Sequence, residues 1–443
     1  MEKAYETFWN KKIETISRSE LEELQLNALK KELQFAYDNS PYYKRSFDEA
    51  KVRPEQLHEL KDLAEFPFID KQTERTTQGK GSFLGELAAV PEEEVIFVSS
   101  SSGSTGVPTM SPFTKADFNE FVDTVSRMFW QIGMRPSSRY LHALNFSLYI
   151  GGPDVLGAQN LGALCIWGGT LPSDRLLYIL KTYQPQIIYT SPSYAWYLGE
   201  TALKKGIDPA KDLAINKILT GGEPGASIET TRAKVEELWG AKMYDFYGLS
   251  DIFGPCAAMC EYQDGLHFAE DQILVETVDP VTGKVLPDGE TGEIVFTTLN
   301  KKARPMIRFR SGDIGRFIKE PCRCGRTHGR LYITGRKDDM FIVSAVNVFP
   351  SDIEAVVHEL SGISAEYLIR VFDKDYTSKY TVEIEKLVNN SESDEELARR
   401  TEAALKARIG VKPYSVIVHP EGGLNTRSEH KAKRFIDERG KKD

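Results

Sequence analysis

Hydroxyl side chains and glycines follow one another between residues 99 and 109, directly after the apolar run at 95–98. Small residues let a backbone approach an anion closely, and hydroxyl and amide groups donate hydrogen bonds to phosphate oxygens. The segment lacks the Gly-Lys-Ser/Thr ending of P-loop ATPases, so their mechanism does not apply here. It is a candidate phosphate-binding loop, and on composition alone a flexible loop is the alternative. Its candidate residues are Ser100, Ser101, Ser102, Gly103, Ser104, Thr105, Gly106 and Thr109.

An aromatic run that ends in a carboxylate occupies residues 244–251. Aromatic rings stack on nucleotide bases, and a carboxylate can hold Mg²⁺ beside phosphates. Residues 311–313 add an aspartate after a glycine turn, where it can accept two hydrogen bonds from a ribose diol. Residues 335–339, Gly-Arg-Lys-Asp-Asp, are short and polar, a composition suited to a linker across which two domains could reorient. Each segment alone is compatible with an ordinary core or surface, and their order along the chain is the stronger signal.

These segments, followed by a lysine near the C-terminus, resemble the adenylate-forming superfamily in type and order. Within it the chain is similar to the phenylacetate-CoA ligase family, and the similarity extends over essentially the whole chain. The resemblance implies that ATP and Mg²⁺ activate an aryl carboxylic acid to an acyl-AMP, which then reacts with CoA. The segments that carry it are 39–43, 103–109, 247–251, 346–350 and 427–433.

The family's functional residues carry over position by position. The resemblance gives Lys431 the role of neutralising charge at the carboxylate and the α-phosphate, with Lys433 as the alternative. Asp251 would hold Mg²⁺, and Asp338 would be the hinge between two domains. Besides the phosphate loop, the implied nucleotide-binding residues are Gly222, Glu223, Pro224, Asp245, Phe246, Tyr247, Gly248, Ser250, Asp313 and Arg336.

The chain departs from the family pattern at several positions. Asp251 is one methylene shorter than the usual glutamate, and Ser344-Ala345 replaces the common Arg-Gly, whereas Thr109 replaces a superfamily lysine as is usual in this family. Ala345 and His430 stand where the family usually has glycines, and the first of these normally lines the path of the pantetheine arm. Two alternatives therefore stay open, an enzyme that loads a carrier-protein pantetheine and an inactive nucleotide-binding paralogue.

The segment at 145–152 is similar to the family's pocket for the aromatic acid. Its candidate wall residues are Phe146, Tyr149, Ile150 and Gly152. Asn145 and Ser147 are more polar than phenylacetate requires, which favours a hydroxylated or amino-substituted aryl acid.

Four residues have the composition of a closed zinc site. Three thiolates and one imidazole complete a tetrahedron around Zn²⁺, and a site filled by four protein ligands is structural. Ordinary buried thiols are the alternative, and Cys256 is the reserve ligand. The proposed ligands are Cys260, His267, Cys322 and Cys324.

The composition limits the classes of protein to consider. Of 443 residues, 41% are hydrophobic and 27% charged, which excludes wholesale disorder. A net charge of −9 argues against binding to a nucleic-acid backbone. No apolar run is long enough to span a bilayer, and residues 1–10 lack the apolar core of a signal peptide, so we expect a cytoplasmic protein without a membrane partner. A homodimer is left open.

The helices and strands that would position these residues can be predicted from the sequence pattern, which indicates an α/β fold. Helical periodicity covers 4–39, and Pro41 ends that pattern. Short β-branched runs at 95–98, 187–189 and 218–219 alternate with helical patterns, which predicts a mostly parallel α/β body, and turn signals within 272–317 predict a β-rich subdomain. We expect an N-terminal domain at 1–337 and a mobile C-terminal α+β domain at 338–443. In the latter the expected helices are 352–360 and 395–409, and the expected strands are 367–371, 380–384 and 414–418.

Overall fold

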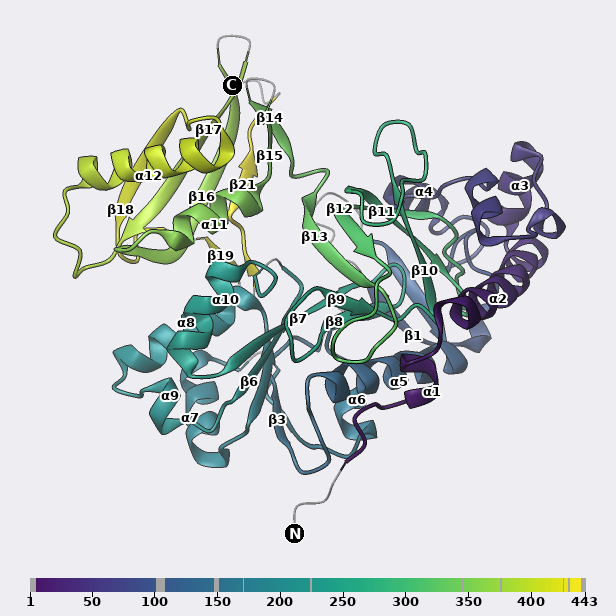
Figure 1. Ribbon diagram of the computed structural model, residues 1–443, viewed down its shortest axis with the longest axis horizontal. Coiled ribbons are helices and arrows are strands. Elements are labelled where there is room, and N and C mark those ends of the chain that lie inside the picture. Colours follow the sequence, from purple (N-terminus) through teal and green to yellow (C-terminus); the bar gives the residue numbers. More distant parts are fainter. Residues whose placement is uncertain are drawn as a thin grey trace. The chain divides into compact units, whose positions relative to one another are not determined.

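The chain folds into two compact units (Figure 1). The computed structural model describes residues 5–100, 108–146, 151–169, 171–223, 225–343, 346–374, 377–424, 426–428 and 431–439. The first unit comprises Met1–Leu171, Pro185–Tyr189 and Tyr244–Ile333. The second comprises Pro172–Gln184, Thr190–Met243 and Thr334–Asp443, so it joins the C-terminal segment to the middle of the chain. The domain boundary at 337/338 stays a prediction.

The first unit begins with helices. Helix α2 (Arg18–Asn39) starts at a capping box, in which Ser17 and Glu20 satisfy each other's backbone amides. Its buried leucines, among them Leu29, face the core, as the periodicity predicted. Pro41 stands at the first turn of the next helix, where its missing N–H costs nothing, so the pattern ends but helical structure resumes. The helices here are α1 (Lys11–Glu14), α3 (Pro41–Ala50), α4 (Lys71–Thr77), α5 (Lys115–Gln131) and α6 (Val155–Asn160), with 3-10 turns at Pro54–Gln56, Leu60–Glu65 and Glu92–Glu94.

Most strands of the first unit form an antiparallel run, which confirms the predicted β-rich segment. In hydrogen-bonding order the strands are β10 (Ile273–Val278), β11 (Gly292–Thr298), β12 (Phe309–Ile318), β13 (Arg330–Arg336), β9 (Leu266–Phe268), β8 (Gly254–Met259) and β7 (Lys242–Leu249). A parallel group holds β3 (Arg139–His142) between β4 (Leu164–Trp167) and β5 (Ile187–Thr190). Strand β13 includes Gly335 and Arg336, which composition had assigned to a linker.

The strand predicted at 95–98 exists, but its place in a parallel sheet was wrong. Strand β1 (Val95–Ser100) pairs antiparallel with β2 (Met110–Thr114) in a sheet of two strands. Residues 99–109 include the end of β1 and lead into β2. Because these two strands form a hairpin, the two ends of the candidate phosphate loop lie together. The residue composition of 95–98 predicted a strand but does not indicate which other strand pairs with it.

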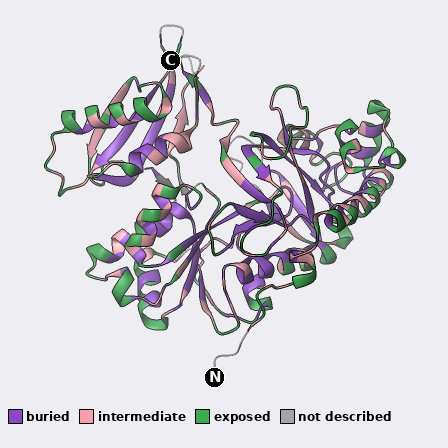
Figure 2. Cartoon of the chain, viewed as in Figure 1, coloured by how far each residue is buried: buried purple, intermediate pink, exposed green. Residues whose placement is uncertain are grey.

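The second unit contains a four-stranded sheet covered by helices α11 (Pro350–Glu359) and α12 (Asp394–Ile409). Figure 2 shows α12 buried along one side, and its buried residues Leu397, Thr401 and Leu405 recur every four positions. The sheet order is β18 (Ser415–Pro420), β17 (Thr377–Lys386), β16 (Ile363–Lys374) and β21 (Phe435–Asp437). Both helices and three of these strands were predicted, and β21 was not.

The rest of the second unit comes from the middle of the chain and from short hairpins. Helices α8 and α10 pack against each other, and α10 also contacts α11. The elements are α7 (Ser173–Tyr183), α8 (Pro192–Lys204), α9 (Pro209–Asp212), β6 (Lys217–Gly221), α10 (Glu229–Trp239), and the hairpin strands β14 (Phe341–Val343), β15 (Val346–Val348), β19 (Arg427–Ser428) and β20 (Lys431–Ala432).

Candidate active site

The candidate phosphate loop is anchored by a strand at each end. Ser100 is buried at the end of β1, with Met110 opposite it on β2. Thr109 is buried directly before β2. The remaining predicted loop residues, Ser101, Ser102, Gly103, Ser104, Thr105 and Gly106, lie outside the described part of the chain.

Thr109 and Asp251, far apart in sequence, meet in the first unit. The Thr109 hydroxyl donates to Asp251 Oδ1 at 3.0 Å. The ammonium of Lys71, the first residue of α4, donates to Thr109 Oγ1 at 2.8 Å and forms an ion pair with Asp251. Burial alone would raise the pKa of Asp251, but Lys71, Arg304 and the Thr109 hydrogen bond together outweigh it and the pKa is lowered. Asp251 is therefore held as an anion beside the candidate phosphate loop, as a cation ligand requires.

Further buried charged side chains lie close to Asp251. Arg304 donates to Asp251 O at 3.1 Å and pairs with Glu74 Oε1 at 2.7 Å. Lys301 donates to Ser111 Oγ at 2.6 Å, and its burial lowers its pKa to about 7. Burial likewise raises the pKa of Glu74 to about 7. Sequence reasoning missed these residues, although charged side chains at 301–304, between the apolar strands, were a visible signal.

Replacing Lys71 by methionine should move the acid limb of the pH profile of kcat/KM for ATP to higher pH. Lys71 makes the largest of the contributions that lower the pKa of Asp251, so its loss lets burial raise that pKa and the carboxylate protonates at a higher pH than in the wild type. The measurement is the initial rate against pH at low ATP, with Lys71→Arg as the control that keeps the charge. An acid limb unchanged in Lys71→Met would contradict the assignment.

Tyr247 and Asp313 also come together. The Tyr247 hydroxyl donates to Asp313 Oδ2 at 2.5 Å, and the Asp313 amide donates to Ser311 Oγ at 3.0 Å. Asp313 is buried on β12, while Tyr247 is half-buried near the end of β7. An expected base-stacking residue thus contacts the expected ribose-binding residue across two strands.

The other predicted residues of β7 differ in their surroundings. Gly248 is exposed, and a Cβ there would lie 2.2 Å from Gly254 O, so the close approach of β8 requires glycine. Phe246 is buried, and its ring centroid lies 5.6 Å from that of Phe129, inside the core. Asp245 is buried on the same strand, and Ser250 lies half-buried in the turn that follows.

Several predicted residues lie in the second unit. Gly222 follows β6 with φ +86°, a conformation that favours glycine, and the next residue, Glu223, accepts a hydrogen bond from the Ser193 amide at 2.9 Å. Arg336 ends β13 and pairs with Asp338 at 3.0 Å. Pro224 lies outside the described residues.

The two candidate lysines lie on one hairpin of the second unit. The backbone of Lys431 pairs with Ser428 across β19 and β20. Lys433 is exposed just beyond it, and its amide donates to Thr426 O at 2.6 Å.

The candidate acyl pocket is described only in part. The Phe146 ring stacks on Trp167 with centroids 5.0 Å apart and lies 5.1 Å from the His142 ring. A Cβ on Gly152 would lie 2.7 Å from Asn145 O, so this turn requires glycine. Tyr149 and Ile150 lie outside the described residues.

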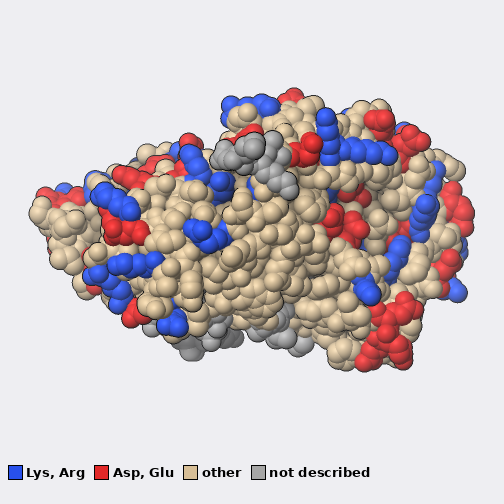
Figure 3. Space-filling model, turned by 90° about the horizontal axis from the view of Figure 1, so that it is seen from below, with Lys and Arg blue, Asp and Glu red and all other residues tan. Residues whose placement is uncertain are grey.

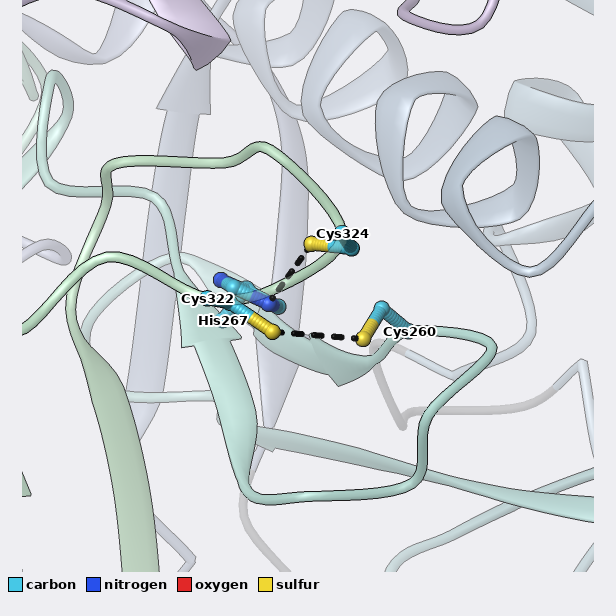
Figure 4. A group of neighbouring side chains, drawn as sticks. All are labelled: Cys260, His267, Cys322 and Cys324. Carbon is cyan, nitrogen blue, oxygen red and sulfur yellow. Dashed lines mark hydrogen bonds between the residues drawn. The ribbon is translucent and has the colours of Figure 1, made fainter.

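The four predicted metal ligands converge in the first unit (Figure 4). Cys260 follows β8, His267 lies on β9, and Cys322 and Cys324 lie between β12 and β13. Their ligand atoms all lie within 4.8 Å of one another. Cys256 is not in this group, and its thiol contacts Tyr247 O at 3.7 Å instead.

The geometry of this cluster fits a tetrahedral metal. The two sulfurs of Cys260 and Cys322 are 3.9 Å apart, close to the ~3.8 Å that two thiolates on one Zn²⁺ would have. His267 Nδ1 contacts the His328 carbonyl at 3.2 Å, which directs Nε2 toward Cys324 Sγ at 3.4 Å. A backbone partner of this kind orients metal-binding histidines.

On the face that Figure 3 shows, acidic and basic side chains lie in small groups, some of one sign only, around a middle that carries few charges. Among the described residues, no helix combines the length and apolarity that crossing a bilayer demands.

Comparisons with known proteins match the chain over most of its length. The model of the AMP-binding enzyme family matches residues 18–300, and that of the AMP-binding enzyme C-terminal domain matches 345–439. The phenylacetate-coenzyme A ligase of Pseudomonas putida is 36% identical over 439 residues, 96% of either chain. That of Thermus thermophilus is 38% identical over 363 residues, 81% of this chain and 80% of the relative.

A solved structure agrees in fold. A 2-hydroxyisobutyryl-CoA ligase in the postadenylation state, in complex with its acyl-AMP, has a TM-score of 0.92 at 30% identity, covering 99% of this chain and 94% of that one. The same ligase in the thioesterification state, with CoA, has a TM-score of 0.74. Together with the paired site residues, these matches show that the chain belongs to the phenylacetate-CoA ligase family of AMP-binding, adenylate-forming enzymes.

Proposed function

We propose that this protein joins an aryl carboxylic acid to the thiol of coenzyme A in two steps that consume ATP. The carboxylate first attacks the α-phosphate, which gives acyl-AMP and pyrophosphate, and the thiolate then displaces AMP to form the thioester. The observation that carries this proposal is the pairing of Thr109 with Asp251 and of Tyr247 with Asp313 in a chain of this family. They support it because each pair brings together side chains from distant segments to which the resemblance gives roles in binding ATP.

The protein's contribution is positioning and charge stabilisation, since the reaction needs no side-chain nucleophile. The loop from Ser100 to Thr109 would hold the ATP phosphates, and Asp313, helped by Arg336, the ribose hydroxyls. Lys431 would offset the charge where one anion attacks another. Asp251 would hold Mg²⁺, directly or through a water, and the bound cation would offset phosphate charge.

The second step is proposed to use a different arrangement of the C-terminal domain, with Asp338 as the hinge. The two TM-scores support this, because they indicate that the related ligase has different conformations in its two half-reactions. Arg336 and Asp338 pair across the turn that ends β13, where a change of φ and ψ would reorient the following chain.

The acid is proposed to be aromatic, with Phe146, Tyr149, Ile150 and Gly152 at its pocket. A hydroxyl or amino substituent is favoured by the polarity of Asn145. Transfer to a carrier protein instead of CoA, a homodimeric state and a cytoplasmic location stay predictions.

The direct test is ATP-dependent pyrophosphate exchange with a panel of aryl and short aliphatic acids, repeated as AMP release with and without CoA. Exchange with an aryl acid and AMP release that saturates with CoA would support the ligase. Exchange with an acid together with AMP release that does not respond to CoA would favour the carrier-protein alternative, and ATP binding without turnover for any acid would favour the inactive paralogue.

The cysteine and histidine cluster is proposed to hold one structural Zn²⁺, which would join the loop after β8 to the loop before β13. Purified protein should contain about one zinc per chain by elemental analysis. Cys324→Ser should lower that content and reduce the Tm by several degrees, because a metal that binds only the folded state stabilises it. Cys165→Ser, outside the cluster, is the control. Full zinc content in Cys324→Ser would rule this ligand out.

A further inference from the structure

Arg434 lies three residues after Lys431 and is enclosed by carboxylates of the second unit. Its side chain is only 14% exposed, and its Nη2 lies 3.5 Å from Glu366 Oε1 on β16. The guanidinium carbon lies 4.9 Å from the centroid of the Tyr367 ring. The Tyr367 hydroxyl in turn donates to Glu354 Oε2 on α11 at 2.8 Å. One largely buried cation therefore belongs to a network that spans the C-terminal sheet and its helix.

A further carboxylate acts on Arg434 from outside the C-terminal segment. Burial alone would lower the pKa of Arg434, but Tyr367, Glu354, Glu366 and Glu223 together raise it. Glu223 also acts on Glu354, whose pKa is raised mainly by burial. Glu223 follows β6 and is fixed by the Ser193 amide at the start of α8. The negative charge that favours the protonated Arg434 guanidinium therefore includes a carboxylate that follows β6.

The backbone around Arg434 fixes the base of the lysine hairpin. The Arg434 carbonyl accepts from the Ile369 amide of β16 at 2.8 Å, and the Thr426 hydroxyl donates to Glu366. Between these points run β19 and β20, and β20 contacts α8. A change at Arg434 would therefore be transmitted directly to the strand that carries Lys431.

Neighbouring contacts hold the same two parts of the unit together. The Thr231 hydroxyl of α10 lies 2.9 Å from His358 Nδ1 and 3.4 Å from Glu354 Oε1, both on α11. The Trp196 ring of α8 lies 4.7 Å from the His358 ring. These groups are buried, so α11 and the carboxylates around Arg434 have a defined position against α8 and α10.

We propose that Arg434 is a positioning residue for adenylation, whose guanidinium holds the base of the Lys431 hairpin on β16 and, through Tyr367 and Glu354, against α10. Glu366 and the Tyr367 ring are its direct neighbours, and Glu354 accepts hydrogen bonds from the Tyr367 hydroxyl and from Thr231 of α10. The inference rests on the proposed function, since it gives Arg434 a role through the adenylating lysine. Thioester formation, which is proposed to need another arrangement of the domain, does not need this link.

The test compares the two half-reactions in Arg434→Met and Arg434→Lys. We expect Arg434→Met to lower the kcat of pyrophosphate exchange on the order of 10- to 100-fold, while thioester formation from supplied acyl-AMP changes less than about threefold. Arg434→Lys keeps the charge without the planar fork and should recover part of the exchange rate. The control is Arg370→Met on β16, which loses contacts to Glu383 and Glu438 within the C-terminal sheet and should affect both half-reactions little.

Amide hydrogen exchange of the unliganded protein gives a readout that needs no substrate. Residues 426–433 should exchange faster in Arg434→Met and not in Arg370→Met. The positioning role would be overturned if Arg434→Met lost both half-reactions equally, or if its hairpin amide hydrogens exchanged no faster than in the wild type. Wild-type protein without pyrophosphate exchange for any acid would instead defeat the proposed function, and the hydrogen-exchange comparison would still decide whether Arg434 holds the hairpin.

Discussion

Lys431→Ala should abolish pyrophosphate exchange and spare thioester formation from a supplied acyl-AMP. The first step brings a carboxylate to a phosphate, and removing a cation that offsets charge in the transition state costs on the order of 10²–10³ in rate. The second step starts from a preformed acyl-AMP and makes no such demand. The measurement is ATP–pyrophosphate exchange beside AMP release from acyl-AMP and CoA.

Lys433→Ala is the matched control, because the two lysines lie two residues apart on one hairpin. If Lys433→Ala loses pyrophosphate exchange and Lys431→Ala keeps it, then Lys433 and not Lys431 offsets the charge during adenylation. Equal loss of both half-reactions in Lys431→Ala would contradict a role limited to adenylation.

Arg308→Met should lower the free energy of unfolding of the first unit by roughly 3–5 kcal/mol, as expected when one partner of a buried ion pair is removed. The Arg308 guanidinium forms a bidentate pair with Glu276 at 3.1 and 3.0 Å and donates to the carbonyls of Ala64 and Phe66 at 2.7 and 2.9 Å. The guanidinium carbon of Arg308 also lies 3.9 Å from the centroid of the Phe68 ring. Methionine would leave a buried carboxylate and two carbonyls without this donor. Thermal unfolding followed by circular dichroism measures the loss.

The double variant Arg308→Met, Glu276→Met should be more stable than the single one, because no unpaired charge is left buried. A single variant as stable as wild type would contradict the argument. We also expect the single variant to react more slowly, because Arg308 helps to hold the segment that leads into α4 and Lys71. In that segment Ile69 forms a β-bridge with Phe309, the residue after Arg308.

The fold and the site could be predicted from the sequence to different extents. Helix α2 was predictable because its cap and leucines are local signals, and the convergence of Cys260, His267, Cys322 and Cys324 because these residue types are those of a closed metal site. The pairing of β16 with β21 depends on a partner distant in the chain, and that of β1 with β2 on an antiparallel hairpin that the apolar run at 95–98 does not by itself encode.

The charged residues around Asp251 show the same limit. Thr109 and Asp251 could be named from their motifs, but Lys71 and Arg304 carry no motif, and only folding brings them to the site. Arg434 was likewise passed over, because a basic residue near a chain end resembles an ordinary solvated one until its carboxylate neighbours are known.

The two units interleave along the chain, and this affects how the protein is made. Part of the first unit lies after the middle segments of the second, and the second needs Thr334–Asp443 as well. The first unit is complete only once Ile333 has left the ribosome, and the four-stranded sheet of the second only once β21 has. Long-range pairing of this kind is slow and exposes apolar surface meanwhile. A nascent chain stopped before Phe435 would therefore leave the edge of β16 unpaired, a surface prone to aggregation and to chaperone binding.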